Sequence, residues 1–347
     1  MDKLKELYVS APFRNVVLNH LERSFRSAKS FSLPIVIQLE LTNLCNLSCS
    51  TCAHSYWDAS LNKPQFLNVD LLASYEFLYE TCSEFLLGGY GEPLLNKAFD
   101  DILNWTKRDP NKIVTLITNA TLFPSKINSL DLIDIVTISM DGVHNVYEEH
   151  RHTPFQNLQD NLDLFRAKYP NKRLDVNLVW NKKTHQNLLK VVEFLNKYNV
   201  TKLNLLPEKI YSTDRLGDCL FDAKDLHGVY VSLQEVVRST NIKINYPNFL
   251  KENQQCNQPL DGIFILADGE IMACCSAIFR GNNERFSLGY LKEFSKEKFL
   301  EFFNQEKMIE YRRARLQGEP YKKQCEDCSF RKIQGAHLDR SLDKLTI

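Results

Sequence analysis

The sequence predicts an α/β protein built on a parallel sheet, either an α/β barrel or a doubly wound sheet. Short β-rich runs alternate with helical stretches from residue 34 to about residue 208, and such alternation implies parallel strands joined by crossover helices. Polar and glycine-rich segments follow the carboxyl end of each predicted strand. Parallel barrels and open sheets build their sites at this edge. We therefore expect one site assembled from six loops.

Six strands and the helices between them follow from runs of β-branched and apolar residues and from helical periodicity. The strands are expected at residues 35–39, 85–87, 113–117, 135–139, 174–179 and 202–206. The intervening helices are expected at 69–81, 97–107, 155–168 and 186–198. Residues 4–31 carry apolar positions at helical spacing, which predicts a helical extension over residues 1–33 that caps the main domain rather than binding a partner. Residues 209–255 form a connector with one helix near 226–237.

Size and charge exclude some classes of protein. The 347 residues are enough for one large α/β domain and a smaller one. The 43 basic and 43 acidic residues balance, which argues against a nucleic-acid partner. No apolar run approaches the length of a membrane span, and residues 1–6 lack the apolar segment of a secretory signal. We expect a cytoplasmic protein without a membrane partner, in which ten cysteines point to metal or redox chemistry.

Three cysteines stand directly after the first predicted strand. Cys45, Cys49 and Cys52 have the spacing C-x3-C-x2-C. Three thiolates cannot complete a tetrahedral zinc site or ligate every iron of a cubic cluster, but they can hold a cluster with one open iron. Structural zinc is the alternative, with His54 as the fourth ligand. Disulfides fit poorly, because three crowded cysteines leave an odd one and nothing marks the chain as secreted.

This triplet, together with its lead-in Glu-Leu-Thr-Asn-Leu at 40–44, resembles the signature of the radical S-adenosylmethionine (radical SAM) family. The resemblance implies a partial (β/α)6 TIM-like barrel over residues 34–240. It also implies a [4Fe–4S] cluster on Cys45, Cys49 and Cys52, whose open iron chelates the amino and carboxylate groups of S-adenosyl-L-methionine. A low-potential electron donor such as flavodoxin or ferredoxin would be a partner.

The loop after the second strand resembles the family's "GGE" segment, with Tyr90 where a glycine is more usual. Gly91 would let the backbone approach the cofactor closely, and Glu92 would accept hydrogen bonds from its ammonium group. A dinucleotide loop is a poor alternative, because the G-x-G-x-x-G pattern is absent. The remaining alternative is an ordinary turn between a strand and a helix.

The segment Ser-Met-Asp-Gly at 139–142 resembles the strand end that contacts ribose and methionine in the same family. By this resemblance Asp141 would accept from the ribose hydroxyls, and Ser139 would bond the ribose or the carboxylate. Arg151 matches a position where the family often places an arginine against the cofactor's carboxylate; an isolated arginine there could equally form a surface ion pair. Asn119 and Asn181, which follow the third and fifth strands, are further candidates for cofactor contacts.

A second constellation of cysteines lies near the C-terminus. It consists of Cys256, Cys274, Cys325 and Cys328. The segment between the first two predicts a β-hairpin that turns at Asp268-Gly269, which would present Cys274 at a strand end. Four thiolates can saturate either a zinc ion or an iron–sulfur cluster.

The layout of these cysteines resembles the SPASM/twitch domain of radical SAM enzymes, which would span residues 241–331 and leave a tail at 332–347. Full SPASM domains carry more cysteines, so the resemblance implies one auxiliary [4Fe–4S] cluster. Structural zinc is the alternative for this site. Cys275 could exchange roles with Cys274, because neighbouring residues on a strand point in opposite directions. Cys82 is expected to pack in the core, whereas Cys219 or Cys275 could donate a hydrogen atom.

The resemblance covers residues 34–331 and implies that S-adenosylmethionine is reductively cleaved to a 5′-deoxyadenosyl radical, which takes a hydrogen atom from the substrate. The residues lining the site should then be apolar or aromatic, and Tyr56, Trp57 and Trp180 are candidates. We expect a net oxidation, a dehydrogenation of a small polar substrate such as a sugar or cyclitol, with the auxiliary cluster as electron acceptor.

Two other functions stay open. One is maturation of a ribosomal peptide by crosslinking or epimerisation; a short N-terminal extension argues modestly against a fused leader-binding domain, and a spare cysteine would serve epimerisation. The other is a non-enzymatic iron–sulfur or zinc protein that acts as an electron carrier or scaffold. Such a protein would explain the four C-terminal cysteines but not the triplet and the six aligned loops.

Overall fold

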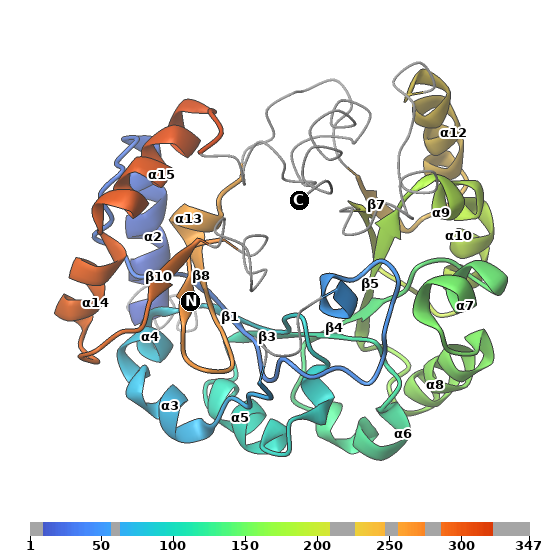
Figure 1. Ribbon diagram of the computed structural model, residues 1–347, viewed down its shortest axis with the longest axis horizontal. Helices are drawn as coiled ribbons and strands as arrows, with labels where there is room; N and C mark the ends of the chain where they lie inside the picture. Colours follow the sequence, from blue (N-terminus) through green and yellow to red (C-terminus); the bar gives the residue numbers. More distant parts are fainter. Residues whose placement is uncertain (1–9, 57–62, 209–225, 247–255, 275–285, 322–347) are drawn as a thin grey trace, which may run out of the picture.

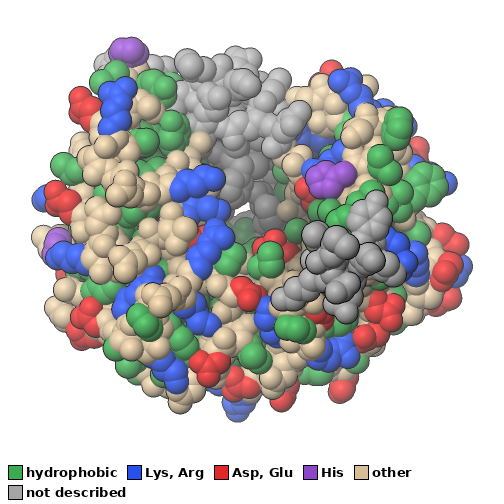
Figure 2. Space-filling model, turned by 180° about the vertical axis from the view of Figure 1, so that it is seen from behind, with side chains coloured by type: hydrophobic (Ala, Val, Ile, Leu, Met, Phe, Trp, Pro, Cys, Tyr) green, Lys and Arg blue, Asp and Glu red, His purple; other side chains and the backbone are tan. Residues whose placement is uncertain are grey.

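The computed structural model describes residues 10–56, 63–208, 226–246, 256–274 and 286–321. Its centre is a curved ten-stranded sheet in the order β10-β9-β8-β1-β2-β3-β4-β5-β6-β7. Helices cover the outer side of the arch and leave its inner side facing the middle of the molecule (Figure 1). From behind, the molecule is hollowed near its centre, and basic and acidic side chains are interspersed over much of the visible face (Figure 2).

The six predicted strands are all present, each within one residue of its expected ends. They are β1 (Val36–Leu39), β2 (Glu84–Leu87), β3 (Ile113–Thr118), β4 (Ile135–Ser139), β5 (Arg173–Trp180) and β6 (Lys202–Pro207). Each pairs in parallel with the next, so the expected partial barrel is confirmed. Alternate side chains are buried in β1, β2 and β6, whereas β3, β4 and β5 each bury three consecutive positions. The carboxyl ends of all six strands therefore lie along one edge.

The helices between the strands form the outer layer (Figure 1). They are α3 (Val69–Ser74), α4 (Glu76–Thr81), α5 (Phe99–Thr106), α6 (Phe123–Lys126), α7 (Asn145–Arg151), α8 (Phe155–Lys168), α9 (Lys182–Gln186), α10 (Leu188–Asn196) and α12 (Leu226–Arg238). The stretch expected as a single helix at residues 69–81 is divided. Tyr75, at φ −95° and ψ 26°, separates α3 from α4. The side chain of Asn181 caps α9, so that a separate helix begins before α10.

The C-terminal hairpin continues the barrel sheet. Strand β8 (Gly262–Ile265) pairs in parallel with β1 and antiparallel with β9 (Ile271–Met272). The turn lies at Asp268-Gly269 as expected, and Gly269 adopts φ +87°, a conformation that glycine tolerates best. Strand β10 (Ser287–Gly289) then pairs with β9. At the opposite edge, β7 (Lys243–Asn245) lies parallel to β6.

Three helices are described in the C-terminal part of the chain. They are α13 (Gln258–Asp261), α14 (Lys296–Phe303) and α15 (Glu306–Gln317). The N-terminal helix α2 (Ala11–Ser24) contacts α4 and α13. Ser10 caps the start of α2, and a proline lies in its first turn. Among the described helices, none combines the length and apolar character needed to cross a membrane. The division of the chain at residues 33, 240 and 331 stays a prediction.

Candidate cofactor-binding site

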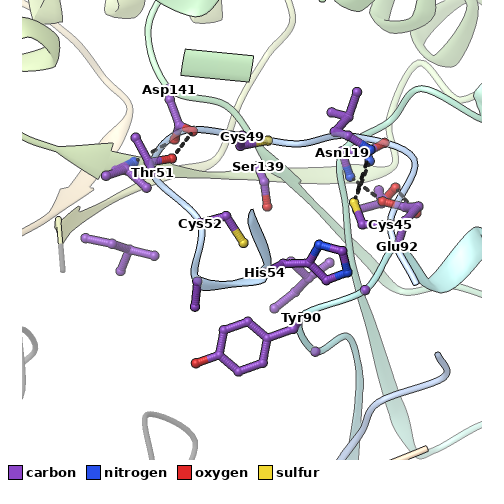
Figure 3. Close-up of a pocket in the computed structure, with 18 of the residues that line it drawn as sticks. Cys45, Cys49, Thr51, Cys52, His54, Tyr90, Glu92, Asn119, Ser139 and Asp141 are labelled. Atoms are coloured by element: carbon purple, nitrogen blue, oxygen red, sulfur yellow. Dashed lines mark hydrogen bonds between the residues drawn. The ribbon is translucent and has the colours of Figure 1, made fainter. Parts of the chain in front are cut away.

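A cavity of about 370 Å³ opens at the carboxyl edge of the sheet. Its lining comes from β1, from the loops after β1, β2, β3 and β4, from the ends of β5 and β6, and from β8. The polar and sulfur-bearing residues in this lining are Gln38, Cys45, Cys49, Thr51, Cys52, His54, Tyr90, Glu92, Thr118, Asn119, Ser139, Asp141, Arg151 and Glu208. Figure 3 labels many of these residues around the same space, including the three cysteines, Glu92 and Asp141. Of the six loops expected to build one site, those after β1, β2, β3 and β4 and the residue after β6 line this cavity, whereas the loop after β5 does not.

The cysteine loop has little regular structure, so side chains hold its backbone. Asn43 accepts from the Gln65 backbone N–H at 2.8 Å and donates to the Lys63 carbonyl at 2.9 Å. Further along, the Ser50 N–H donates to the carbonyl of His150 at 2.9 Å. These bonds join the loop to the segment before α3 and to α7. The positions of the three cysteines are consequently set by elements far away in the sequence.

All three thiols line the cavity, and each is substantially removed from water. Burial raises the pKa of Cys45 and of Cys49, and it raises the pKa of Cys52 to about 12. Ligation by thiolates would therefore release protons. Three thiols around one cavity fit a cluster that keeps one iron open, because three donors leave a cubic cluster one ligand short.

The zinc alternative finds no support in the described residues. Within them, no group of three histidine, cysteine or acidic side chains could hold a single metal ion. His54 lines the cavity, but its Nε2 atom lies 3.0 Å from the Asn43 carbonyl, to which it donates. That ring nitrogen is therefore used to hold the loop.

The loop after β2 lies directly against the lead-in to the cysteines. The Glu92 N–H donates to the Leu44 carbonyl at 2.8 Å. A Cβ atom at Gly91 would lie 2.1 Å from the Thr42 carbonyl oxygen and 2.5 Å from that of Leu44. Only glycine fits this approach of two backbones. Tyr90 lies on the other side of the loop, where it lines the cavity and packs against the cluster that contains Phe264.

Glu92 is buried and its carboxylate already accepts three hydrogen bonds. The donors are the Thr118 hydroxyl at 2.7 Å and the backbone N–H groups of Asn119 at 2.8 Å and Leu94 at 3.2 Å. Burial raises the pKa of Glu92 to about 6, against the lowering effect of these bonds. Two carboxylate oxygens offer about four acceptor positions, so one position is left for a donor in the cavity.

Asp141 and Arg151 face each other instead of standing apart as two cofactor contacts. Arg151 Nε lies 2.8 Å from Asp141 Oδ2, an ion pair whose angle is poor for a hydrogen bond. Asp141 also accepts from the Thr51 hydroxyl at 3.2 Å and from the Val179 N–H at 3.0 Å. Arg151 Nη1 in turn donates to Cys49 Sγ at 3.6 Å. The pair thus braces the cysteine loop, although both residues also line the cavity.

The other predicted contacts divide into two groups. Ser139 and Asn119 line the cavity. Asn119 Nδ2 lies 3.9 Å from Cys45 Sγ. Asn181 is not among the lining residues, because its side chain caps α9 and donates to Glu208 Oε2 at 2.6 Å. Glu208 itself does line the cavity.

Several lining residues were not predicted as cofactor contacts from the sequence. They include Gln38, Thr51, Glu208 and Phe264. Glu208 carried a usable signal, because it stands immediately after the sixth strand. Gln38 is a polar residue within the apolar run of β1, and this is a weaker signal of a site residue.

The expected aromatic lining is wrong for two of its three members. Trp180 is buried behind the cavity and donates from Nε1 to His185 Nδ1 at 3.3 Å. Tyr56 donates its hydroxyl to the Ser50 carbonyl and is not among the lining residues. Each ring is used to hold backbone or core. Trp57 lies outside the described residues.

Of the C-terminal cysteines, the structure describes Cys256 and Cys274. Cys274 is buried and follows β9, the second strand of the hairpin, as expected. Four other cysteines of interest, Cys219, Cys275, Cys325 and Cys328, lie outside the described residues. Cys82 is fully buried in the core and its thiol lies 3.6 Å from the Tyr79 carbonyl, which confirms its packing role.

Two solved structures resemble this fold. Streptococcus suis SuiB bound to the precursor peptide SuiA matches with a TM-score of 0.62 and 15% identity, over 92% of this chain and 75% of that chain. anSMEcpe with bound AdoMet and the Cp18Cys peptide matches with a TM-score of 0.59 and 18% identity, over 82% of this chain and 84% of that chain. A search of curated proteins gives no match.

Two family models match the sequence. The model of the radical SAM superfamily matches residues 39–195, and the model of an iron–sulfur cluster-binding domain, SPASM, matches residues 256–329. The matched ranges together take in more than half of the chain. These domains imply three cofactors: a [4Fe–4S] cluster that binds S-adenosylmethionine, auxiliary cluster binding in the SPASM domain, and S-adenosylmethionine itself. The chain belongs to the radical SAM superfamily and carries a C-terminal SPASM domain.

Proposed function

We propose that the cavity binds S-adenosylmethionine beside a cluster on Cys45, Cys49 and Cys52, and that hydrogen-atom abstraction from a substrate takes place there. One observation carries this proposal: the three thiols and the Glu92 carboxylate line one cavity, although they come from two different loops. When bound, the cluster and S-adenosylmethionine supply the 5′-deoxyadenosyl radical, and the auxiliary cluster supplies an acceptor for one further electron.

Each of the chain's own residues has a defined task in this proposal. Glu92 offers its remaining acceptor position to the cofactor's ammonium group, and Gly91 lets the loop that carries Glu92 lie against the backbone of the cysteine lead-in. Ser139 provides a hydroxyl at the end of β4 for the ribose or the carboxylate. Asp141 and Arg151 hold the cysteine loop through Thr51 and Cys49 rather than serving mainly as cofactor ligands.

For the substrate we propose a small polar molecule of the sugar or cyclitol kind, which is oxidised. Support comes from two polar side chains that line the cavity. The Glu208 carboxylate is held by Asn181 and lines the cavity at the end of β6, and Gln38 lines it from β1. Such groups can bind hydroxyls, and a carboxylate can also take the proton that an alcohol loses when it becomes a ketone.

Peptide maturation is the second candidate function, and the solved structures favour it. The titles of the SuiB and anSMEcpe structures name bound peptides, and both folds match most of this chain. At 15% and 18% identity this likeness concerns the fold. The peptide candidate is therefore kept as the alternative to the small-molecule substrate.

Cofactor cleavage can be tested without knowing the substrate. The chain is reconstituted anaerobically with iron and sulfide, reduced with dithionite and supplied with S-adenosylmethionine. Formation of 5′-deoxyadenosine and methionine is expected, and the Cys45→Ala/Cys49→Ala/Cys52→Ala variant should form neither. Absence of cleavage in the wild-type chain would contradict the proposal and leave an electron carrier or scaffold.

The substrate class needs a separate assay. Perdeuterated sugars and cyclitols, and a deuterated precursor peptide if one is encoded beside the gene, are each offered to the reconstituted chain. Transfer of deuterium into 5′-deoxyadenosine identifies the class that is bound for hydrogen abstraction. Transfer from the peptide alone would overturn the small-molecule proposal.

A further inference from the structure

The helix α2 is attached to the protein through its polar side. Asn15 donates to the Leu33 carbonyl and accepts from the Leu33 N–H, both at 2.9 Å. Asn19 donates to the Leu260 carbonyl at 2.7 Å. Glu22 accepts from the Phe31 N–H at 2.6 Å and from the Ser32 N–H at 2.8 Å. Hydrogen bonds of these side chains to backbone groups thus hold the helix in place.

The opposite side of α2 is apolar and faces solvent. This outer face of α2 consists of Val17, Leu18 and Leu21, together with Phe25, the residue that caps the C-terminal end of the helix. Leu21 is 48% exposed and Phe25 is 81% exposed, and Phe31, beyond the end of the helix, is 58% exposed. A surface helix ordinarily turns such residues toward the core. Here the arrangement is reversed, because the buried positions are the asparagines Asn15 and Asn19.

All of the exposed charged residues between positions 11 and 31 are basic. Arg14, Arg26 and Lys29 are exposed, and exposed His20 lies on the same helix. The single acidic residue of this segment, Glu22, is turned inward by its bonds to the backbone. Arg23 is partly buried and pairs with Asp261 at 3.2 Å. The outer face of α2 therefore has an apolar centre with positive charges around it and no compensating negative charge from this segment.

This charge distribution decides between possible occupants. A second copy docked face to face would bring the same basic residues together, which costs energy by repulsion between like charges. An anionic surface would neutralise them. The face also offers bulky apolar side chains without hydroxyl or indole groups, so it has little means of selecting one hydrogen-bonding pattern. An apolar helix face of phenylalanine, leucine and valine with basic neighbours is typical of helices that lie in the interface of an anionic lipid bilayer.

We propose that the outer face of α2 is a docking surface for an anionic lipid membrane. The attachment is peripheral and needs no membrane-spanning segment, so it is compatible with the absence of a long apolar helix among the described residues. It revises the expectation, drawn from the lack of a spanning run, that the protein has no membrane partner. The proposal is independent of the substrate, because α2 contributes no residue to the cavity.

The test is flotation of the full-length chain with two kinds of vesicle, one of phosphatidylcholine alone and one with about 30% phosphatidylglycerol. The expected result is binding to the anionic vesicles that exceeds binding to the neutral ones by at least about fivefold, and that weakens when salt is raised to about 0.5 M. A Leu21→Glu/Phe25→Glu variant should lose most of this binding. Arg14→Gln/Arg26→Gln/Lys29→Gln should lose the preference for anionic vesicles.

The matched control places the same charges on exposed apolar residues elsewhere. Leu189, on α10, is 50% exposed and Val231, on α12, is 44% exposed. Leu189→Glu/Val231→Glu should bind vesicles as the wild-type chain does. Because the positions changed on α2 are exposed, far-ultraviolet circular dichroism and thermal unfolding should show that all variants remain folded.

Two results would overturn the proposal. One is equal binding, or no binding, of the wild-type chain to anionic and neutral vesicles. The other is a wild-type dimer in light scattering that Leu21→Glu/Phe25→Glu converts to a monomer, which would assign the face to a second copy of the chain.

Discussion

Glu40 and Ala267, which are 227 positions apart, are joined by a hydrogen bond of 3.3 Å from the Ala267 backbone N–H to Glu40 Oε2. The other oxygen of this buried carboxylate accepts from the Tyr90 N–H at 3.3 Å. Glu40 follows β1 and leads into the cysteine loop. One side chain thereby connects the cysteine lead-in, the loop after β2 and the C-terminal hairpin. This connection fixes the position of the hairpin that leads to Cys274 relative to the candidate site.

Replacing Glu40 by glutamine tests this connection. The amide has one acceptor oxygen in place of two, so a backbone N–H of Tyr90 or Ala267 would lose its partner. We expect the free energy of unfolding to fall by about 1–3 kcal/mol, measured by urea denaturation. The control is Glu76→Gln, whose partly exposed ion pair with Arg108 should contribute less than about 1 kcal/mol. Equal effects of the two changes would contradict the connecting role.

Gly91→Ala should disable the site while leaving most of the fold intact. The added Cβ would lie 2.1 Å from the Thr42 carbonyl oxygen, so the loop carrying Glu92 must move away from the cysteine lead-in. We expect formation of 5′-deoxyadenosine to fall on the order of 10²-fold, as displacement of a positioning group by about 1 Å can do.

Gly228→Ala is the matched control for Gly91→Ala. Gly228 lies in α12, and a Cβ there meets no atom within 4 Å. Alanine in an exposed helix should stabilise the chain by about 0.5–1 kcal/mol and leave cofactor cleavage unchanged. Cleavage by the Gly91→Ala variant at the rate of this control would show that the backbone approach is unnecessary.

Arg151→Met should be strongly destabilising, because it leaves the buried Asp141 carboxylate without its cation. The expected loss in unfolding free energy is about 3–5 kcal/mol. Arg108→Met removes an arginine from a half-exposed ion pair and should cost far less. If Arg151→Met unfolds at the same urea concentration as the wild type, the pair does not brace the loop as described.

Stability should fall on the acid side because of His185. Burial lowers the pKa of His185, whose Nδ1 accepts from Trp180 Nε1 and whose Nε2 therefore donates to Ser232 Oγ at 2.8 Å. The folded state keeps the ring neutral, whereas the unfolded chain takes up a proton below about pH 6.5. This contribution is present above that pH and is lost as the pH falls. Urea unfolding between about pH 7.5 and 5.5 should show a smaller decline for His185→Gln; an identical decline would assign the pH dependence to other groups.

The strands of the barrel could be predicted from the sequence because each is a short run with its own pattern. Residues 135–139, for example, are apolar and β-branched and are bounded by polar residues on both sides. The break at Tyr75 could not be predicted, since the apolar periodicity of residues 69–81 continues through it and the backbone conformation alone interrupts the helix. The pairing of β8 with β1 could not be predicted either, because nothing in the sequence of either strand specifies which strand it pairs with.

The site was predictable in its location more than in its contacts. The order of strands brings polar residues to one edge, so the cavity residues Glu92, Asn119 and Ser139 could be named in advance. Whether a side chain faces the cavity depends on tertiary contacts. Asn181 became a helix cap, and Asp141 became the partner of an arginine that α7 brings back from ten positions along the chain.

Iron content tests the central claim most directly. Iron and sulfide are counted per chain after anaerobic reconstitution, in the wild type and in Cys45→Ala/Cys49→Ala/Cys52→Ala. Two independent clusters predict about eight irons in the wild type and about four in the variant. About four irons falling to none would contradict the account, because the C-terminal cysteines would then hold no cluster and could not accept the substrate's electron.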